Sequence, residues 1–156
     1  MQKYSVLMSL YKKENPEYLN LAIESMVNQT LKPEEIVIVK DGEITAELQA
    51  VLDDYSTKYL ELFHIVGYEK NRGLALNYGL EHCKNELVAR MDTDDISKPQ
   101  RCEKQLEAFE KYPNYAIIGS AVDEFCGTTD NITGRRVVPS SPRDIYNFAK
   151  RRSAFN

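Results

Sequence analysis

Short apolar runs alternate along the chain with longer segments whose apolar residues recur every three or four positions. The runs at 4–10, 36–39, 62–67 and 87–91 have the length and composition of buried strands. The first segment between them has the period of a helix with one buried face: Leu19, Ala22, Ile23, Met26 and Val27. Strands that alternate with helices predict an α/β fold, with a mostly parallel sheet, right-handed crossovers and helices on its faces.

Several positions predict where helices begin. Asn15-Pro16 and Ser141-Pro142 each place a capping side chain before a proline, which suits the first position of a helix. Thr45 can cap a second helix, Ser97-Lys98-Pro99 is expected to open another, and 73–82 is predicted to be helical. Further along, 115–122 predicts a fifth strand, 123–134 a turn rich in Gly, Thr, Asp and Asn, and Val137-Val138 a short strand.

Length, charge and cysteine content narrow the class of protein. A chain of 156 residues can bury one substantial core, so we expect a single domain over 1–156. The formal net charge of −4 argues against a general nucleic-acid binder, whose contact surface is usually basic. No apolar run approaches the length of a membrane-spanning helix. Three widely spaced cysteines fit reduced thiols and a cytoplasmic location better than a disulfide framework.

Polar or aromatic residues directly follow each of the first four predicted strands. In a parallel sheet, ligands bind beyond the carboxyl ends of the strands, near the point where strand order reverses. A tyrosine ring can stack on a base, a carboxylate can accept a base N–H, and an arginine can bind a carbonyl or a phosphate. We therefore predict a nucleotide site formed by Tyr11, 40–42, 70–73 and 92–95.

Asp92-Thr93-Asp94-Asp95 is the most informative of these clusters. Its three carboxylates repel one another unless solvent or a divalent cation offsets the repulsion. Mg²⁺ and Mn²⁺ prefer oxygen ligands and keep part of their coordination shell for substrate phosphates, so the cluster predicts a metal–diphosphate site. The alternative is a turn with helix-capping aspartates, because Asp is favoured in both roles.

Other familiar chemistries lack their motifs. The chain has no G-x-G-x-x-G, no G-x-x-x-x-G-K-[ST], no C-x-x-C and no G-x-S-x-G. His64 and His82 are too far apart in sequence to form a local zinc motif. These absences argue against a dinucleotide fold, a P-loop protein and a serine hydrolase.

Several segments, in this order, resemble the family 2 glycosyltransferases. Ser5 to Tyr11, Leu21 to Thr30 and Ile36 to Gly42 are similar to the opening of that family. Asn71 to Leu80 resembles its asparagine- and glycine-containing third segment, and Asp92-Thr93-Asp94-Asp95 matches its D-x-D signature with the usual further Asp. The resemblance implies the Rossmann-like GT-A fold and a nucleotide-sugar donor, and it is nearest to bacterial enzymes of capsular or exopolysaccharide assembly.

The resemblance, which covers 4 to about 122, also implies residue roles. Residues after the first strand would line the base pocket, the carboxylate after the second would bind the base, typically uracil, and the third segment would lie near base and ribose. Either Asp94 or Asp95 would coordinate Mn²⁺ or Mg²⁺ on the diphosphate. The implied donor site is Ser9, Tyr11, Asp41, Asn71, Arg72 and Asp92, and the implied metal site is Asp92, Asp94 and Asp95.

Two departures from the family pattern matter. Lys40 stands where many relatives have an acidic residue, which would change the electrostatics of the base pocket. The chain also stops at Asn156, whereas relatives continue with an acceptor-binding half that supplies the carboxylate base. We therefore expect a truncated, N-terminal part of a longer enzyme, with its catalytic base beyond Asn156. Asp123 and Glu124, which follow the predicted fifth strand, are the local alternatives, and we expect them to cap a hairpin instead.

The resemblance implies an inverting, metal-dependent transfer of a sugar from a UDP-sugar to a saccharide or lipid-linked acceptor, in cell-surface polysaccharide synthesis. Two alternatives remain: a nucleotide-sugar-binding module without transfer activity, and a D-x-D phosphoryl-transfer hydrolase, whose motif belongs on a first strand. The expected partners are the donor and the acceptor, with no nucleic acid. Self-association and peripheral contact with the inner face of the membrane are further expectations.

Overall fold

The computed structural model describes residues 2–68 and 72–151. The chain divides into two compact units, Met1–Leu106 and Glu107–Asn156, and the boundary falls inside one helix. Each unit is described by itself. The expectation of a single domain over 1–156 stays a prediction, because two compact units can belong to one domain or to two.

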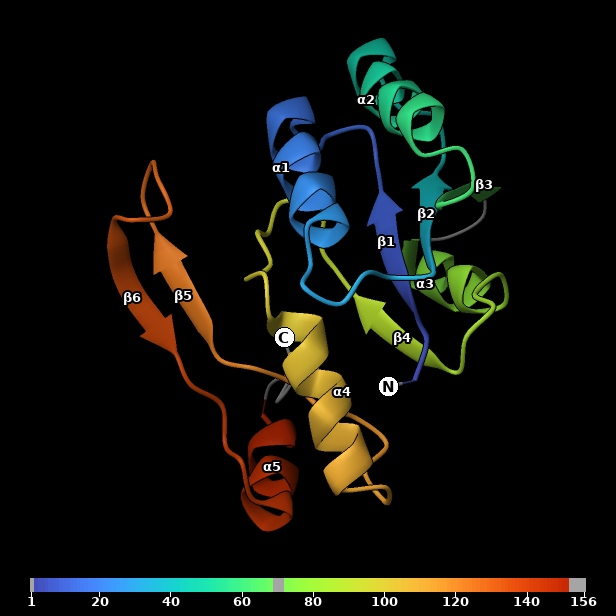
Figure 1. The fold of residues 1–156 in the computed structure, drawn as a ribbon. Helices are drawn as coiled ribbons and strands as arrows, with labels where there is room; N and C mark the ends of the chain where they lie inside the picture. Colours follow the sequence, from blue (N-terminus) through green and yellow to red (C-terminus); the bar gives the residue numbers. More distant parts are fainter. Residues whose placement is uncertain (1, 69–71, 152–156) are drawn as a thin grey trace. The chain divides into compact units, whose positions relative to one another are not determined.

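The first unit contains a four-stranded sheet (Figure 1). Its strands are β1 (Tyr4–Leu10), β2 (Glu35–Asp41), β3 (Phe63–Tyr68) and β4 (Leu87–Arg90). The spatial order is β3-β2-β1-β4, and each neighbouring pair is parallel. This confirms the predicted α/β fold with a parallel sheet, and it places β1 between two hydrogen-bonded neighbours.

Helices α1 (Pro16–Val27), α2 (Ala46–Lys58) and α3 (Arg72–Leu80) connect the strands, and α4 (Arg101–Lys111) follows β4. The predicted caps are present. The Asn15 side chain accepts from the backbone N–H of Glu17 at 2.7 Å, and the Thr45 hydroxyl accepts from that of Leu48 at 3.3 Å. Capping of this kind satisfies N–H groups that a helix start leaves without partners.

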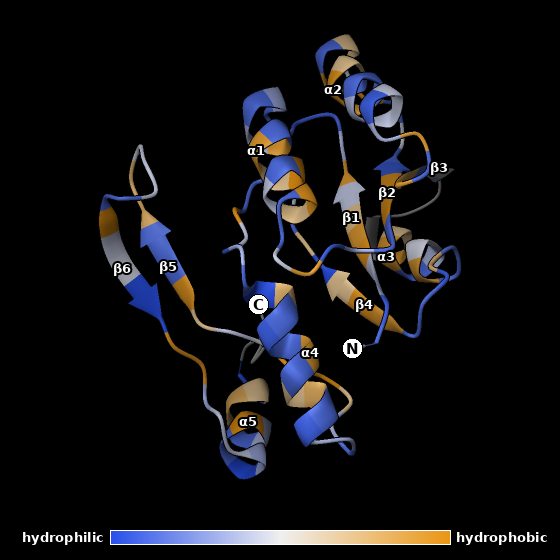
Figure 2. Cartoon of the chain, in the orientation of Figure 1, coloured by the Kyte–Doolittle hydropathy of each residue, from blue (hydrophilic) through white to orange (hydrophobic). Residues whose placement is uncertain are grey.

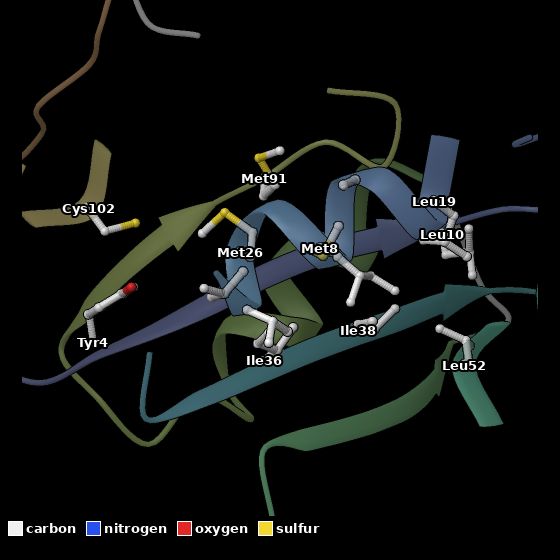
Figure 3. Close-up of a cluster of buried hydrophobic side chains, with 14 of the residues drawn as sticks. Tyr4, Met8, Leu10, Leu19, Met26, Ile36, Ile38, Leu52, Met91 and Cys102 are labelled. Atoms are coloured by element: carbon white, nitrogen blue, oxygen red, sulfur yellow. The ribbon is translucent and has the colours of Figure 1, made fainter. Parts of the chain in front are cut away.

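The two faces of the sheet carry separate cores. Side chains of α1, α2 and the start of α4 pack on one face, and α3 packs on the other. Figure 2 shows apolar residues on the sides of α1 and α2 that face the strands. In the larger core, Tyr4 and Cys102 lie at one end and Leu10 at the other, beside Leu19 and Leu52 (Figure 3). Alternate residues of β1 and β2 thus point to opposite faces, as a two-residue strand period requires.

The second unit contains a hairpin and a short helix. The hairpin pairs β5 (Val122–Phe125) with β6 (Ile132–Arg136) in antiparallel fashion, and α5 (Pro142–Ala149) follows. Ser141 caps α5 as predicted, since its hydroxyl accepts from the backbone N–H of Asp144 at 3.2 Å.

Three predictions for this part of the sequence were wrong. Residues 115–121 are not a strand, 123–134 is a hairpin rather than only a turn, and Val137-Val138 lies outside β6. Apolar content alone suggested strands, but a strand also needs a partner for its backbone. Pairs of opposite charge across β5 and β6 favour the pairing that forms, Asp123 with Arg135 and Glu124 with Arg136.

Within the described residues, no helix is both long enough and apolar enough to cross a membrane.

Gly79 provides a test of the packing of α3 on the sheet. A Cβ placed there would lie 2.5 Å from Leu7 Cδ1 and 2.6 Å from Val39 Cγ2, and both of these side chains are buried. We predict that Gly79→Ala lowers the free energy of unfolding by about 1–2 kcal/mol, because overpacking outweighs the gain in helix propensity. Urea denaturation measures the change.

Gly67→Ala is the matched control, because a Cβ at that position in β3 would meet no atom within 4 Å. We expect its effect to stay within about 0.5 kcal/mol. A Gly79→Ala variant as stable as the wild type would contradict the close packing of α3 against β1 and β2.

Candidate functional site

Strand order reverses at β1, and this point defines the candidate site. The chain proceeds from β1 to β2 and β3 on one side, then returns to place β4 on the other side of β1. In sheets of this kind the ligand crevice lies beyond the carboxyl ends of the strands at the reversal. Arg90, the last residue of β4, lies opposite Leu7, whereas Leu10, the last residue of β1, lies opposite Lys40 of β2. The three strands therefore end at the same edge of the sheet, and β4 ends first.

Ser9 and Tyr11 lie at the centre of this edge. Ser9 is the half-buried residue near the end of β1, and Tyr11, also half-buried, follows the strand directly. The Tyr11 carbonyl accepts from the backbone N–H of Glu14 at 3.1 Å, so the chain turns sharply before α1 begins. Both side chains are therefore held at the edge by a buried strand on one side and a short turn on the other.

Asp41 ends β2 beside this centre. It is half-buried, and its register partner is Tyr68 at the end of β3. The next residue, Gly42, has a φ of 82° and donates its N–H to the Tyr68 carbonyl at 2.7 Å. A positive φ suits glycine, so this residue lets the chain leave the sheet directly after Asp41. The backbone of Asp41 is held at the strand end as a result.

The aspartate segment follows β4 on the other side of β1. Met91, Thr93 and Ser97 are buried, whereas Asp92, Asp94 and Asp95 are exposed. The Met91 N–H donates to the Leu7 carbonyl at 3.0 Å, which extends the β1–β4 pairing by one residue. The small and apolar side chains therefore anchor the segment to the fold, and the carboxylates are presented outward.

Arginines hold the start of this segment. Arg90 Nη2 lies 2.7 Å from Asp92 Oδ1, and both side chains are more than half exposed. An exposed pair of this kind contributes little to stability, so Asp92 can exchange this partner for another at small cost. Arg101 donates to the Arg90 carbonyl at 2.8 Å and lies 3.3 Å from Met91 Sδ, which joins the end of β4 to the start of α4.

Glu14 belongs to the same cluster, although sequence reasoning did not select it. Its pKa is raised above the ordinary value of 4.5, first because burial disfavours the charged form and then because of the charge of Asp94. A hydrogen bond with the Thr93 side chain lowers the pKa, and Asp92 raises it further. Its position just before the Asn15 cap, in the turn that leaves β1, was the available signal.

The described residues contain no group of three or more His, Cys, Asp or Glu side chains close enough together to hold a metal ion by themselves. The donor set still fits a cation that is shared with a ligand. Mg²⁺ is usually bound through one or two carboxylates, with substrate phosphates and waters completing the shell. Successive exposed carboxylates, with a further one of raised pKa beside them, supply such oxygen ligands.

Some predicted residues cannot be placed in the site. Asn71 lies outside the described residues, and Arg72 is known only as the first residue of α3. Lys40, the departure from the family pattern, donates to Gln49 Oε1 on α2 at 3.2 Å. Its charge is thereby held beside α2.

Asp123 and Glu124, the local alternatives for a catalytic base, lie on the hairpin of the second unit. Arg135 donates from Nε and Nη2 to the two carboxylate oxygens of Asp123, at 2.5 and 3.1 Å. Arg136 donates from Nη2 to Glu124 Oε1 at 2.8 Å. Both carboxylates are therefore engaged in ion pairs that run across the hairpin. Both residues lie within the paired strand β5 of the hairpin and not at its cap.

A cavity of about 640 Å³ lies at the opposite edge of the sheet, at the amino end of β2. Its lining residues Glu34 and Lys84 are engaged in ion pairs with Lys3 and Glu35. We favour the carboxyl edge as the functional site, since a parallel sheet opens its ligand crevice there.

The raised pKa of Glu14 leads to a prediction on stability. The folded protein binds the proton on Glu14 more tightly than the unfolded chain does, so wild-type stability falls as pH rises from 4.5 through the raised value. Glu14→Gln lacks this penalty. We predict a higher melting temperature than the wild type at pH 7 without metal, and a difference that disappears below pH 4.5. Scanning calorimetry measures it.

Glu61→Gln controls for the loss of one negative charge, because Glu61 is an exposed residue before β3. Equal gains from both variants would mean that the effect comes from net charge and not from the neighbours of Glu14.

Solved structures share this fold. The structure of a mannosyltransferase, PcManGT, from Pyrobaculum calidifontis in complex with GDP-Man and Mn²⁺ matches with a TM-score of 0.58 at 21% identity, over 94% of this chain and 38% of that one. The crystal structure of S. aureus TarS 1–349 in complex with UDP matches with a TM-score of 0.60 at 22% identity, over 89% and 38%. At these identities the matches show the GT-A fold alone.

Sequence relatives are more similar. An uncharacterized glycosyltransferase of Haemophilus influenzae is 46% identical over 99% of this chain and 58% of its own length. The amylovoran biosynthesis glycosyltransferase AmsE of Erwinia amylovora is 45% identical over 98% of this chain and 57% of its own length. The UDP-Gal:alpha-D-GlcNAc-diphosphoundecaprenol beta-1,3-galactosyltransferase of Escherichia coli is 38% identical, over 99% and 56%. The chain thus spans somewhat more than half the length of these relatives.

The model of the family described as glycosyl transferase family 2 matches residues 5–156, which is nearly the whole sequence. The chain belongs to glycosyl transferase family 2.

Proposed function

We propose that this chain forms the donor-binding part of a metal-dependent, inverting glycosyltransferase that uses a UDP-sugar in cell-surface polysaccharide synthesis. The observation that carries the proposal is the placement of Asp41 and of the 92–95 segment on the two sides of β1, at the carboxyl edge of the sheet. Family membership favours this function over the D-x-D hydrolase. The named activities of the AmsE and galactosyltransferase relatives support polysaccharide assembly.

The separation of the two groups suits a nucleoside diphosphate. Two strand spacings separate β2 from β4, which is about 10 Å. A base bound at Asp41 would therefore leave its diphosphate within reach of the aspartate segment, with Ser9 and Tyr11 between them. The half-buried Tyr11 ring offers a surface for stacking, and Asp41 offers an acceptor for an imide N–H of uracil.

Asp92, Asp94 and Asp95 would hold Mn²⁺ or Mg²⁺ together with the diphosphate. A bound divalent cation neutralises charge on the departing nucleoside diphosphate and helps to orient it. Exposure of the three carboxylates fits this role, because they must reach a ligand in solution. Asp92 would exchange its exposed contact with Arg90 for a contact in the complex.

In the reaction that we propose, an acceptor hydroxyl loses its proton to a carboxylate base and attacks the anomeric carbon, whose bond to the diphosphate oxygen breaks. A single displacement inverts that carbon. We place the base in the part of the longer relatives that this chain does not span, because Asp123 and Glu124 are bound by arginines. The acceptor would be a saccharide or a lipid-linked sugar, reached from the cytoplasmic side of the membrane.

The metal assignment predicts a linkage between cation and nucleotide. UDP affinity should rise about tenfold or more when Mn²⁺ replaces EDTA, and Asp94→Ala should remove most of that rise, in line with the cost of losing a group that supports a metal site. Isothermal titration calorimetry measures both. The fold should be retained, because Asp94 is exposed.

Asp54→Ala is the matched control, since it removes an equally exposed carboxylate from α2. Identical UDP affinity with Mn²⁺, with EDTA and in the Asp94→Ala variant would overturn the assignment.

The base assignment predicts selectivity. We expect UDP to bind more tightly than GDP or ADP, and Asp41→Asn to reduce that preference by about 1–3 kcal/mol, because a site built for one hydrogen-bond pattern penalises another. Competition titrations with the three nucleotides give the ratio. A wild-type protein that binds UDP and GDP equally would refute the role given to Asp41.

A further inference from the structure

Gln29 is a buried polar residue two positions after the last residue of α1, with 1% of its surface exposed. Its amide nitrogen donates to the Ser25 carbonyl at 3.0 Å and to the Lys98 carbonyl at 2.9 Å. Its amide oxygen accepts from the backbone N–H of Cys102 at 3.0 Å. Both donor hydrogens and one acceptor position are thus used, and two of the three partners are far away in sequence.

Those distant partners lie just beyond the aspartate segment. Lys98 belongs to the stretch between Asp95 and α4, and Cys102 is in the first turn of α4. The first N–H groups of a helix have no partner inside the helix, so Gln29 satisfies one that the start of α4 would otherwise leave unpaired. Figure 1 shows the start of α4 beside the end of α1.

Neighbours of Gln29 on α1 and just after it strengthen the same contact. The Thr30 N–H donates to the Pro99 carbonyl at 2.8 Å, and the Ser97 N–H donates to the Ser25 hydroxyl at 3.0 Å. These bonds hold 97–99 against the last part of α1 and the residues after it. The chain turns at 99–100, and α4 begins at Arg101 and not at the predicted Ser97-Lys98-Pro99.

The aspartate segment is consequently fixed at both ends. On one side, the Met91 N–H is bound to β1, and on the other side, Ser97 and Lys98 are bound to the end of α1. Residues 92–96 lie between these two points. The directions in which their carboxylates point therefore depend on where α1 holds the second point.

We propose that Gln29 is a positioning residue for the donor site, which it serves by holding the 97–102 segment and thereby setting the orientation of the Asp92, Asp94 and Asp95 carboxylates. This inference rests on the proposed function. Gln29 touches neither nucleotide nor metal in this account; it acts through the backbone. Coordination of Mg²⁺ or Mn²⁺ depends on exact ligand placement, so a small displacement of the segment weakens it.

Gln29→Met tests the proposal because it keeps the length of the side chain and removes all three hydrogen bonds. Replacing a residue that orients metal ligands without touching the metal typically lowers metal affinity by about 10–100-fold. We therefore expect the Mn²⁺-dependent gain in UDP affinity to fall by about tenfold or more. Affinity for UDP in EDTA should stay unchanged. A purely structural role would lower the melting temperature without changing the ratio of the two affinities.

Glu35→Gln provides the matched control. Glu35 is also 1% exposed, and its carboxylate accepts from the Ser5 hydroxyl at 2.7 Å and from the Lys84 N–H, at the amino edge of the sheet. We expect this variant to lose stability while it keeps the full metal-dependent gain. Gln29→Asn retains an amide that is one methylene shorter, and it decides the matter if Gln29→Met does not fold.

The outcomes are separated by measuring the UDP affinity of each protein once in Mn²⁺ and once in EDTA. The temperature is one at which thermal melts show that every variant is folded. The proposal is supported if the Mn²⁺-dependent gain in UDP affinity is lost in the Gln29 variants and kept in Glu35→Gln. An unchanged gain in folded Gln29 variants overturns it, and so does an equal loss in Glu35→Gln. A wild-type protein that shows no gain refutes the proposed metal-linked function and this inference together.

Discussion

Parallel pairing of β1 with β2 on one side and with β4 on the other is the constraint on which the rest of the structure depends. β1 is hydrogen-bonded to β4 up to Leu7 and to β2 up to Leu10, so its carboxyl end lies at the centre of the candidate site. The pairing of β1 with β2 positions Asp41, and the pairing of β1 with β4 positions Asp92. The helices then have only two places to pack, one on each face, and the alternating side chains of β1 supply a core for both.

The aspartate segment shows how this scaffold presents charge without destabilising itself. Buried Met91, Thr93 and Ser97 alternate with exposed carboxylates, so the repulsion between the carboxylates is felt mainly in solvent. The raised pKa of Glu14 indicates that part of the repulsion remains. A bound cation would relieve the remaining repulsion, which gives the proposed metal a physical reason.

The sequence was sufficient to predict the strands and helices of the first unit, apart from the start of α4, because their apolar periodicity and capping residues agree with the fold that forms. It failed at 115–121, which lie outside the strands of the structure, and at the hairpin, whose charge pairs are visible only when β5 and β6 are aligned. Motifs after strands located the candidate site. Glu14 and Gln29 were missed because their roles depend on neighbours that are distant along the chain and that only the folded structure brings close.

Addition of Mn²⁺ and UDP to the isotope-labelled protein, followed by nuclear magnetic resonance, tests the central claim most directly. The paramagnetic ion broadens amide signals near its binding position. The account predicts that signals from residues 92–95 broaden first, those of Glu14 and Ser9 next, and those of Glu34 and Lys84 at the opposite edge last. Earliest broadening at Glu34 and Lys84, or broadening at 92–95 that UDP does not strengthen, would contradict the account.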